Sequence, residues 1–521
     1  MGTGTRAIAI GRTAAALIGV LAAVAALAAG HLIAGLLEPN SSPYLAVGNT
    51  AIDLTPEPVK AFAIEQFGEQ DKLVLLLGMG VVILLLAAVA GLLSRRSPVP
   101  GLVVIGVFGA AGTAAALARP TLGVLGLVAP VVAALAGLAT FWWLHHKAPR
   151  PEVAADEDAD PANSSGGSGR RRFLISSAAV TAGVAASGAV GQLLIGNQGA
   201  EQSRRAIGRI VPARKAPAIP AGADFSGAGT PPFLTPNPDF YRVDTALRVP
   251  QLPAEEYRLR VHGMVERELV LSYQDLLSRR LVEKTITMTC VSNPVGGPYV
   301  STSNFTGVPI REILNEAGVR PGAEQVFSTS VDGYTAGTPV EVLLEEDRDA
   351  LIALGMNGEP LPLEHGFPVR MVTPGLYGYL SATKWLVDLE LTTFDKVTYW
   401  EERGWAERAP IKTQSRIDRP GAFQQLPAGK TTAAGIAWAQ TTGIERVEVR
   451  VDSGPWQKAE LSTQVDANTW RMWRIELDLA PGGHNIECRA TDRSGYTQTS
   501  DRVPPIPDGA TGWHSIFCTA Q

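Results

Sequence analysis

The chain has 521 residues and a formal net charge of −5. This length exceeds what one hydrophobic core usually supports, so several domains are expected. The acidic balance argues against nucleic acid as a partner. Three cysteines are too few for a disulfide scaffold or for a zinc or iron–sulfur site of the CxxC type.

The first 200 residues are rich in Ala, Val, Leu and Gly and predict a membrane region. Apolar runs long enough to span a bilayer lie at residues 13–37, 73–93, 101–117 and 121–144. Basic residues flank these runs at Arg6, Arg12, Arg95, Arg96, Lys147 and Arg150, and the acidic loop 38–71 follows the first run. The positive-inside rule therefore places the N-terminus and the Lys147 linker in the cytoplasm. Residues 1–146 are predicted to form a four-helix transmembrane region.

Histidines in this region raise the question of a b-type haem. His31 stands alone in the first run, and His145 and His146 lie beside Lys147 at the end of the fourth. Interfacial histidines next to a cation are commoner than haem ligands. No b-type haem is predicted. The sequence contains no CxxCH motif, so covalent c-type haem is not expected either.

Residues 147–169 are acidic and then Ser/Gly-rich, which predicts a disordered cytoplasmic linker. Arg170-Arg171-Arg172-Phe173-Leu174 then opens a weakly apolar run. This segment, 170–196, resembles a twin-arginine export signal and is equally compatible with an ordinary fifth spanning helix. The Pro/Ala/Gly-rich residues 197–232 are predicted to be an extracytoplasmic tether. The protein is thus expected in the plasma membrane as a multi-pass chain with its catalytic half outside the cytoplasm.

The second half has the mixed polarity of a globular protein. Strand alternation at 257–261 and 268–271, a short helix from Ser272, and a helix at 308–316 ended by Gly318 predict an α+β domain. After Val397 short strands recur at 435–438, 446–451, 470–479 and 485–490, separated by Gly/Pro turns, as in a β-sandwich. Cys488 falls on an inward-facing strand position; whether it pairs with Cys518 is left open by the spacing.

Cys290 is the residue with the clearest chemical meaning. It ends the alternating run Thr285-Ile286-Thr287-Met288-Thr289 and precedes the turn Val291-Ser292-Asn293-Pro294. A thiol at a strand-to-turn junction is held rigidly yet faces an opening, as a metal ligand or nucleophile must. The alternative is a small buried core residue.

Further motifs decide between these alternatives. They are Met356-Asn357-Gly358-Glu359-Pro360-Leu361-Pro362, His365-Gly366-Phe367-Pro368-Val369-Arg370, Pro374-Gly375 and Lys384-Trp385-Leu386. With Cys290-x-x-Asn293, this ordered set resembles the molybdopterin-binding domain of the sulfite oxidase family. The resemblance covers residues 233–521 and is closest in layout to membrane-anchored, actinobacterial-type members. It implies an oxidoreductase domain at 233–397 and an immunoglobulin-like dimerisation domain at 398–521, hence a homodimer.

The resemblance also implies the cofactor Mo-molybdopterin, with one molybdenum per chain. In the family a cysteine thiolate, here Cys290, ligates the metal, and the pterin dithiolene supplies two further sulfurs. The pterin phosphate needs fixed cations and donors. By resemblance the cofactor-binding residues are Tyr241, Arg242, Asn293, His365, Arg370, Ser381, Ala382, Thr383 and Lys384.

The substrate pocket departs from the family pattern. Arg242 matches the first pocket arginine, but Pro294 and Val295 stand where the second is expected, and residues 506–512 lack the third before Trp513-His514. The pocket tyrosine falls on Trp405. The catalytic set implied is therefore Cys290, Arg242 and Trp405. Lys412 and Arg416 are either replacement cations or part of a solvated linker.

These expectations describe a membrane-anchored molybdenum enzyme that transfers an oxygen atom to or from a small sulfur substrate. Its electron-transfer partner is not identified by any motif. One alternative is a sulfoxide or N-oxide reductase of the same fold, and another is a non-catalytic scaffold. The retained Cys290, His365 and Arg370 argue against the scaffold.

Overall fold

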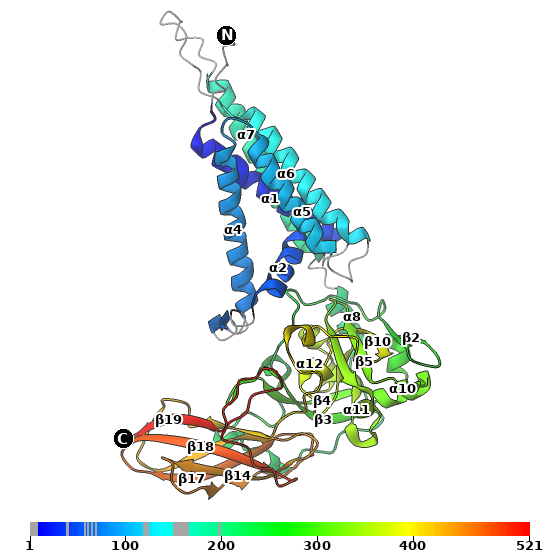
Figure 1. The fold of residues 1–521 in the computed structure, drawn as a ribbon, viewed down its shortest axis with the longest axis vertical. Helices are drawn as coiled ribbons and strands as arrows, with labels where there is room; N and C mark the ends of the chain where they lie inside the picture. Colours follow the sequence, from blue (N-terminus) through cyan, green and yellow to red (C-terminus); the bar gives the residue numbers. More distant parts are fainter. Residues whose placement is uncertain are drawn as a thin grey trace, which may run out of the picture. The chain divides into compact units, whose positions relative to one another are not determined.

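The computed structural model describes residues 9–37, 41–56, 59, 62–63, 66–67, 70–117, 124–149, 166–195 and 199–521. They form two compact units: residues 1–198 with 246–248, and residues 199–245 with 249–521. Helices make up the first unit, and helices and sheets the second (Figure 1). Arg6, Arg150 and most of the predicted linker lie outside the described residues.

The first unit contains the predicted apolar helices. Its helices are α1 (Arg12–Leu37), α2 (Pro43–Leu54), α4 (Asp71–Leu93), α5 (Val99–Leu117), α6 (Val128–Lys147) and α7 (Gly166–Ile195). Five of the described helices, all except α2, are long and apolar enough to cross a membrane. The helix α7 begins at Gly166, four residues before Arg170.

Glycines allow two of these helices to touch. A Cβ atom on Gly19 of α1 would lie 1.9 Å from the carbonyl oxygen of Ala87 on α4, and a Cβ on Gly91 would lie 2.0 Å from the carbonyl oxygen of Ala15. Small residues of this kind permit the close backbone approach on which helix association in a membrane relies. Any larger side chain at Gly19 or Gly91 therefore forces α1 and α4 apart.

The second unit begins with a mixed α+β region, as predicted. One sheet has the order β2-β1-β10-β5-β6, and another has the order β3-β4-β7-β8 with β9 paired to β7. Strand bounds are β1 Arg258–Gly263, β2 Leu269–Ser272, β3 Val282–Thr289, β4 Val300–Pro309, β5 Gln325–Ser330, β6 Thr335–Pro339, β7 Leu351–Met356, β8 Glu359–Pro360, β9 Arg370–Val372 and β10 Leu386–Thr392. The helices are α8 Gly199–Ile207, α9 Tyr273–Leu277, α10 Ile310–Ala317, α11 Val340–Leu344 and α12 Gly378–Ser381. One large apolar core packs against both sheets.

Local sequence signals explain where the short helices begin and end. Ser272 caps α9 in a reciprocal capping box with Asp275, so two N-terminal amide groups are satisfied. Gly318 ends α10 with a φ of 72°, a conformation that favours glycine. The predicted helix 308–316 starts two residues late because Val308 and Pro309 pair with β7 as the end of β4.

The C-terminal region consists of two further sheets around their own core (Figure 1). One has the order β11-β13-β17-β16 and the other β12-β19-β18-β14-β15. The strands are β11 Gln414–Arg419, β12 Gln425–Leu426, β13 Gly429–Trp438, β14 Ile444–Val451, β15 Gln457–Lys458, β16 Glu460–Leu461, β17 Arg471–Leu479, β18 Gly482–Asp492 and β19 His514–Ala520. This arrangement confirms the predicted strand-rich region after Val397.

Cys488 is fully buried in this core, as predicted, and it does not pair with Cys518. Both are free thiols. In the β18–β19 register Cys488 lies opposite His514 and Cys518 opposite His484, which separates the two cysteines by four residue pairs. At about 3.3 Å of rise per residue that offset is far beyond disulfide reach.

Residues 199–232 hold more structure than a plain tether would. They include α8, and Arg214 forms a parallel bridge with Val282 at the start of β3. Ala223, together with Phe233, is buried in a small core with Trp438 and Trp470 of the C-terminal region. The segment thus runs along the globular unit and contacts both of its parts.

The strand β3 is held from two directions. It pairs antiparallel with β4 over its full length, from Val282↔Gly307 to Thr289↔Val300. From the C-terminal region, the Gln440 amide donates to the Thr287 carbonyl at 3.1 Å and to the Thr289 hydroxyl at 3.2 Å. The Thr287 N–H donates to the Asn468 carbonyl at 2.9 Å, and the Thr287 hydroxyl accepts from the Trp470 N–H at 2.7 Å.

Replacing Gln440 by Ala is expected to lower the stability of the second unit by about 1–3 kcal/mol, because buried acceptors on β3 lose their donor. The measurement is the urea midpoint of tryptophan fluorescence on the full chain in detergent. Gln457→Ala, an exposed position on β15, is the control and should change stability by less than about 0.5 kcal/mol. Equal midpoints for the two variants would show that Gln440 does not brace β3.

Candidate functional site

Cys290 lies directly after β3, where the β3–β4 hairpin opens into the loop of residues 290–299. Its N–H donates to the Tyr299 carbonyl at 3.0 Å, and its own carbonyl accepts from the Asn293 N–H at 3.1 Å. These bonds fix the backbone on both sides of the thiol. The side chain is 8% exposed, and Sγ lies 2.9 Å from the Ser292 hydroxyl. Burial raises the pKa of the thiol, partly offset by Ser292 and by the charge of Lys384.

Asn293 completes the loop and leaves one donor unused. Its Oδ1 accepts from the Tyr299 N–H at 2.8 Å. Its Nδ2 is buried and has no hydrogen-bond partner among the described residues. A buried donor without an acceptor is costly, so such a group usually marks a place where a ligand binds. Asn293 is joined to Cys290 through the backbone, because its N–H donates to the Cys290 carbonyl.

Three tyrosines lie close enough to Cys290 to interact with it electrostatically. Tyr241 is stacked on Phe240 with ring centroids 5.3 Å apart. Burial raises the pKa of Tyr241, Tyr334 and Tyr377, and for each of them the charge of Cys290 adds to the effect. All three hydroxyls therefore stay protonated at neutral pH. Sequence reasoning found Tyr241 but missed Tyr334 and Tyr377, which come from separate segments that only the fold brings to Cys290.

Arg370 is a buried cation without a carboxylate partner among the described residues. It lies on β9, is 4% exposed, and donates from Nη1 to the His365 carbonyl at 3.1 Å and from Nη2 to the Ala382 carbonyl at 3.4 Å. Its guanidinium lies 5.7 Å from the Phe305 ring centroid. Burial lowers its pKa to about 10, which still leaves it charged at neutral pH. A buried, uncompensated guanidinium favours an anionic ligand.

His365 is neutral at physiological pH. Its Nε2 lies 2.9 Å from the Asn237 carbonyl, to which it donates. Burial, with the charge of Arg370, lowers its pKa to about 4. The imidazole therefore contributes a hydrogen-bonding group beside Arg370 and not a second charge.

Lys384 and Arg242 share one carboxylate. Lys384 Nζ donates to Asp244 Oδ2 at 2.7 Å and to the Glu364 carbonyl at 3.1 Å, while Arg242 Nε donates to the same Asp244 oxygen at 2.9 Å. Burial lowers the pKa of Lys384 to about 8 even though Asp244 favours the charged form. Because these two cations share one carboxylate, the group keeps a net positive charge. Asp244 was not singled out in the sequence because only its contacts show its role.

The other members of the predicted phosphate-binding stretch, residues 381–383, make hydrogen bonds within the chain. The Ser381 hydroxyl donates to the carbonyls of Leu376 and Tyr377 at 3.0 and 3.1 Å. The Thr383 hydroxyl lies 2.7 Å from that of Ser328. Ala382 contributes its carbonyl to Arg370. Ser381 and Thr383 are thus already hydrogen-bonded within the chain, so only Lys384 of this stretch presents a charged side chain.

Trp405 packs against the residue that follows the thiol. It is 7% exposed and belongs to an apolar cluster with Val291, Tyr377 and Tyr379. The ring centroids of Trp405 and Tyr379 are 5.8 Å apart. Its indole Nε1 is buried and has no hydrogen-bond partner among the described residues. Trp405 therefore supplies a flat wall and an unused N–H donor close to the Cys290 loop.

The two candidate replacement cations differ. Lys412 donates to Asp508 at 2.8 Å and to the Gly509 carbonyl at 2.7 Å, so its charge is largely compensated. Arg416 donates from Nη1 to the carbonyl of Gly297, in the Cys290 loop, at 2.9 Å. Neither is part of a solvated linker, because Arg416 lies on β11 and Lys412 is tied to the 508–509 turn.

The residues around Cys290 fit the Mo-molybdopterin that the sequence implies. A free thiol is present for a soft metal. Arg370, Lys384 and Arg242 together exceed the nearby carboxylate charge, as a phosphate requires. The unpartnered Nδ2 of Asn293 lacks only an acceptor. These observations concern this chain's own side chains and are consistent with one another.

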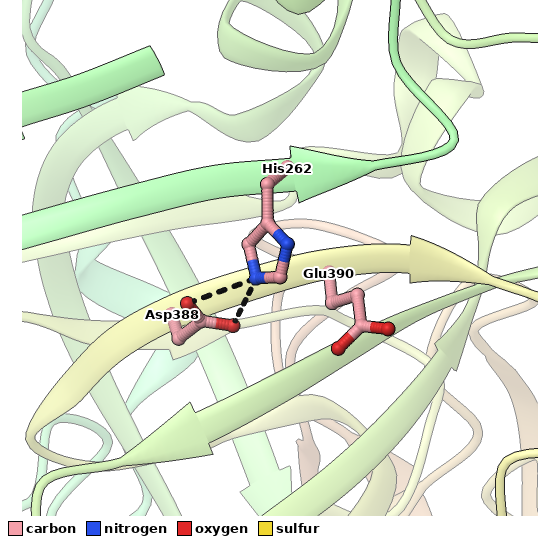
Figure 2. A group of neighbouring side chains, drawn as sticks. All are labelled: His262, Asp388 and Glu390. Atoms are coloured by element: carbon pink, nitrogen blue, oxygen red, sulfur yellow. Dashed lines mark hydrogen bonds and ion pairs between the residues drawn. The ribbon is translucent and has the colours of Figure 1, made fainter. Parts of the chain in front are cut away.

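A second cluster of polar residues lies on the first sheet. His262 on β1 and Asp388 and Glu390 on β10 bring ligand atoms within 4.8 Å of one another (Figure 2). His262 Nε2 lies 3.0 and 3.1 Å from the two Asp388 oxygens, and Glu390 is paired with Lys396. Because these partners already satisfy the three side chains, the cluster is an ion-pair group on the half-exposed face of the sheet and carries no metal assignment.

Comparisons with known proteins identify sequences related to this chain. A family model described as "Oxidoreductase molybdopterin binding domain" matches residues 246–400. Mitochondrial sulfite oxidase of Homo sapiens is 30% identical over 336 residues, which cover 54% of this chain and 61% of that protein. Sulfite oxidase of Gallus gallus is 31% identical over 334 residues, covering 54% and 72%. This chain thus spans less than two thirds of the mammalian relatives it matches.

More distant similarity extends to other proteins. Nitrate reductase [NADH] of Spinacia oleracea is 26% identical over 330 residues, covering 51% of this chain and 35% of that protein. Among solved structures, the sulfane dehydrogenase SoxCD of Paracoccus pantotrophus aligns with a TM-score of 0.48 at 22% identity, covering 55% of this chain and 81% of that chain.

Replacing Cys290 by Ser is expected to abolish turnover while the protein still folds, because a hydroxyl fills the space of the thiol but cannot match thiolate donation to a soft metal. The measurements are steady-state activity, metal content and circular dichroism of the purified variant. Cys488→Ser, which changes a thiol in the C-terminal core, is the matched control and should keep activity. Activity of Cys290→Ser within a few-fold of the unmodified protein would remove Cys290 from the metal site.

Proposed function

Because this chain belongs to the sulfite oxidase family, we propose that it is a membrane-anchored molybdenum-cofactor oxidoreductase that transfers an oxygen atom on a small sulfur substrate. That it is an oxidoreductase with a molybdopterin-binding domain follows from its relatives. The observation that carries the proposal is the rigidly held, buried Cys290 together with two buried cations: Arg370, which has no carboxylate partner among the described residues, and Lys384, which shares Asp244 with Arg242. A non-catalytic scaffold has no need to retain both.

The chain's own residues divide the work of holding the cofactor. Molybdopterin, when bound, supplies the two-electron redox chemistry of oxygen-atom transfer. Cys290 would ligate the metal, and Asn293 would offer its unpartnered amide beside it. Arg370, Lys384 and Arg242 would hold the phosphate, with the neutral His365 as a further hydrogen-bonding group. The protonated hydroxyls of Tyr334 and Tyr377 would add no negative charge near Cys290.

The substrate class is the finer part of the proposal. Val295 places no cation in the Cys290 loop, and Trp405 offers a broad apolar wall with one N–H donor. Taken by themselves, Val295 and Trp405 would also admit a larger, less charged molecule than sulfite. A sulfoxide or N-oxide reductase is therefore kept as the second candidate, favoured by the unpartnered Trp405 Nε1, which would donate to a single S–O or N–O oxygen.

The location proposed is the plasma membrane, with the second unit outside the cytoplasm. Five helices of suitable length and hydropathy support membrane anchoring. Arg170–Arg172 and Phe173 stand in the first turns of α7, so the motif and the last apolar helix form one element. Twin-arginine export of folded cargo would suit a domain that receives its pterin in the cytoplasm.

Assembly and electron transfer complete the proposal. The strand-rich region 398–521, with two sheets around a shared core, supports an immunoglobulin-like domain that joins two copies as a homodimer. A separate protein or small molecule would accept or supply electrons one at a time. This chain covers less than three quarters of the length of the two sulfite oxidases and of the spinach nitrate reductase, so their partners and substrates come to it only as proposals.

Introducing a cation into the Cys290 loop by Val295→Arg should improve sulfite turnover more than turnover of a neutral sulfoxide. A guanidinium in this half-buried loop favours an anion, whereas for a neutral ligand it adds only an unpaired charge. Steady-state kcat/KM for both substrates, with Val295→Met as a control for size, measures the difference. Efficient sulfite oxidation by the unmodified protein that falls in Val295→Arg would show that another group already binds the anion.

Changing Arg170, Arg171 and Arg172 together to Lys should leave the first four apolar helices inserted but keep the catalytic half in the cytoplasm. The lysines preserve the positive charge, so only receptor recognition of arginine is lost. Protease accessibility of residues 199–521 from outside intact cells is the readout, and Arg204→Lys with Arg205→Lys serves as the control. Unchanged accessibility in the triple variant would contradict a twin-arginine role.

A further inference from the structure

Two side chains from the C-terminal sheets lie against the glycines of the Cys290 loop. Arg416 on β11 donates from Nη1 to the Gly297 carbonyl at 2.9 Å. His514, the first residue of β19, packs on Gly296, where a Cβ atom would lie 2.2 Å from its Nε2. The two are also linked to each other, because the N–H of Ile417, next to Arg416, donates to His514 Nδ1 at 2.9 Å. One loop thus connects Cys290 to a cation and an imidazole.

Each of these side chains has a donor left over. Since His514 Nδ1 accepts a hydrogen bond, the proton of the neutral ring is on Nε2. Burial, with the charges of Arg416 and Arg502, lowers the pKa of His514 to about 4, so the ring is neutral at physiological pH. Among the described residues, none accepts a hydrogen bond from His514 Nε2 or from Arg416 Nη2.

The charge of Arg416 is only partly used within the protein. Its Nε donates to Asp418 Oδ1 at 2.7 Å, and the side chains are 12% and 13% exposed. Burial raises the pKa of Asp418, and its Oδ2 has no partner among the described residues. If Arg416 only held the loop in place, its Nη1 and Nε donors would be sufficient. The free Nη2 beside the imidazole N–H is what a carboxylate-like or sulfur oxyanion requires.

We propose that Arg416 and His514 form the oxyanion-recognition part of the substrate site, binding one small sulfur oxyanion through Arg416 Nη2 and His514 Nε2–H. The proposal rests on the function proposed above and refines its substrate class. The cation absent from Pro294-Val295 within the loop is supplied to the same loop from β11. The C-terminal sheets then take part in substrate selection as well as in bracing β3.

Sulfate, an unreactive oxyanion, is the probe that tests this inference on the full-length holoenzyme, in which bound pterin already occupies the phosphate site. Its affinity is measured by isothermal titration calorimetry and, separately, as a competitive inhibition constant against sulfite. Arg416→Gln combined with Asp418→Asn removes the ion pair as a unit and avoids leaving a buried carboxylate alone. We expect sulfate affinity to fall about tenfold or more in this double variant.

Three controls separate binding from structure. Asp418→Asn alone releases Arg416 and should bind sulfate as well as or better than the unmodified protein. Arg419→Gln, an exposed arginine on the same strand, should leave sulfate affinity unchanged. Arg416→Lys keeps a positive charge opposite Asp418 but loses the forked donors of the guanidinium, so it should bind sulfate more weakly. This single variant provides the test if the double variant fails to fold.

The outcomes are decisive in either direction. Weaker sulfate binding in the double variant or in Arg416→Lys, with molybdenum content preserved, supports the assignment. Unchanged sulfate affinity in a folded, molybdenum-loaded variant overturns it, as does the absence of sulfate binding to the unmodified holoenzyme at millimolar concentrations. Failure of the proposed function would instead appear as a loaded enzyme that turns over neither sulfite nor sulfoxides, while the sulfate titration still decides the role of Arg416.

Discussion

Hydrogen bonds to β3 from two directions fix the position on which the whole site depends. Pairing with β4 sets the register of the strand, and Gln440, Asn468 and Trp470 of the C-terminal region hold it from elsewhere in the unit. Cys290 follows immediately and its own N–H is bonded to Tyr299. A metal ligand must be held within a fraction of an ångström to keep its geometry. The strand-rich region therefore supports the site through the backbone of β3.

Electrostatics around the thiol follow from burial. Arg370 and Lys384 are buried, and the carboxylates near them do not balance their two positive charges. Burial lowers the pKa of both side chains. Keeping such cations charged is unfavourable unless a ligand compensates them. The neutral His365 and the protonated tyrosines add no charge of either sign. Binding of an anionic phosphate would therefore stabilise the folded unit as well as position the cofactor.

Sequence reasoning located the parts that depend on local order. The strand before Cys290, the cap of α9, the glycine after α10 and the apolar helices are all encoded by neighbouring residues. Residues defined by long-range contacts were missed. Asp244 acquires its role only when Lys384, 140 residues away, meets it, and Tyr334 and Tyr377 reach Cys290 only through the fold. The role of Arg416 was left between two alternatives because no spacing relates β11 to Gly297.

The most direct measurement is the molybdenum and pterin content of the purified full-length protein. Elemental analysis gives the metal, and fluorescence of the oxidised pterin gives the organic part. The account predicts one molybdenum and one molybdopterin per chain, both retained through gel filtration. Protein that is folded and produced in cells able to make the cofactor, yet contains neither, would contradict the assignment of Cys290 and its surrounding cations to a molybdenum site.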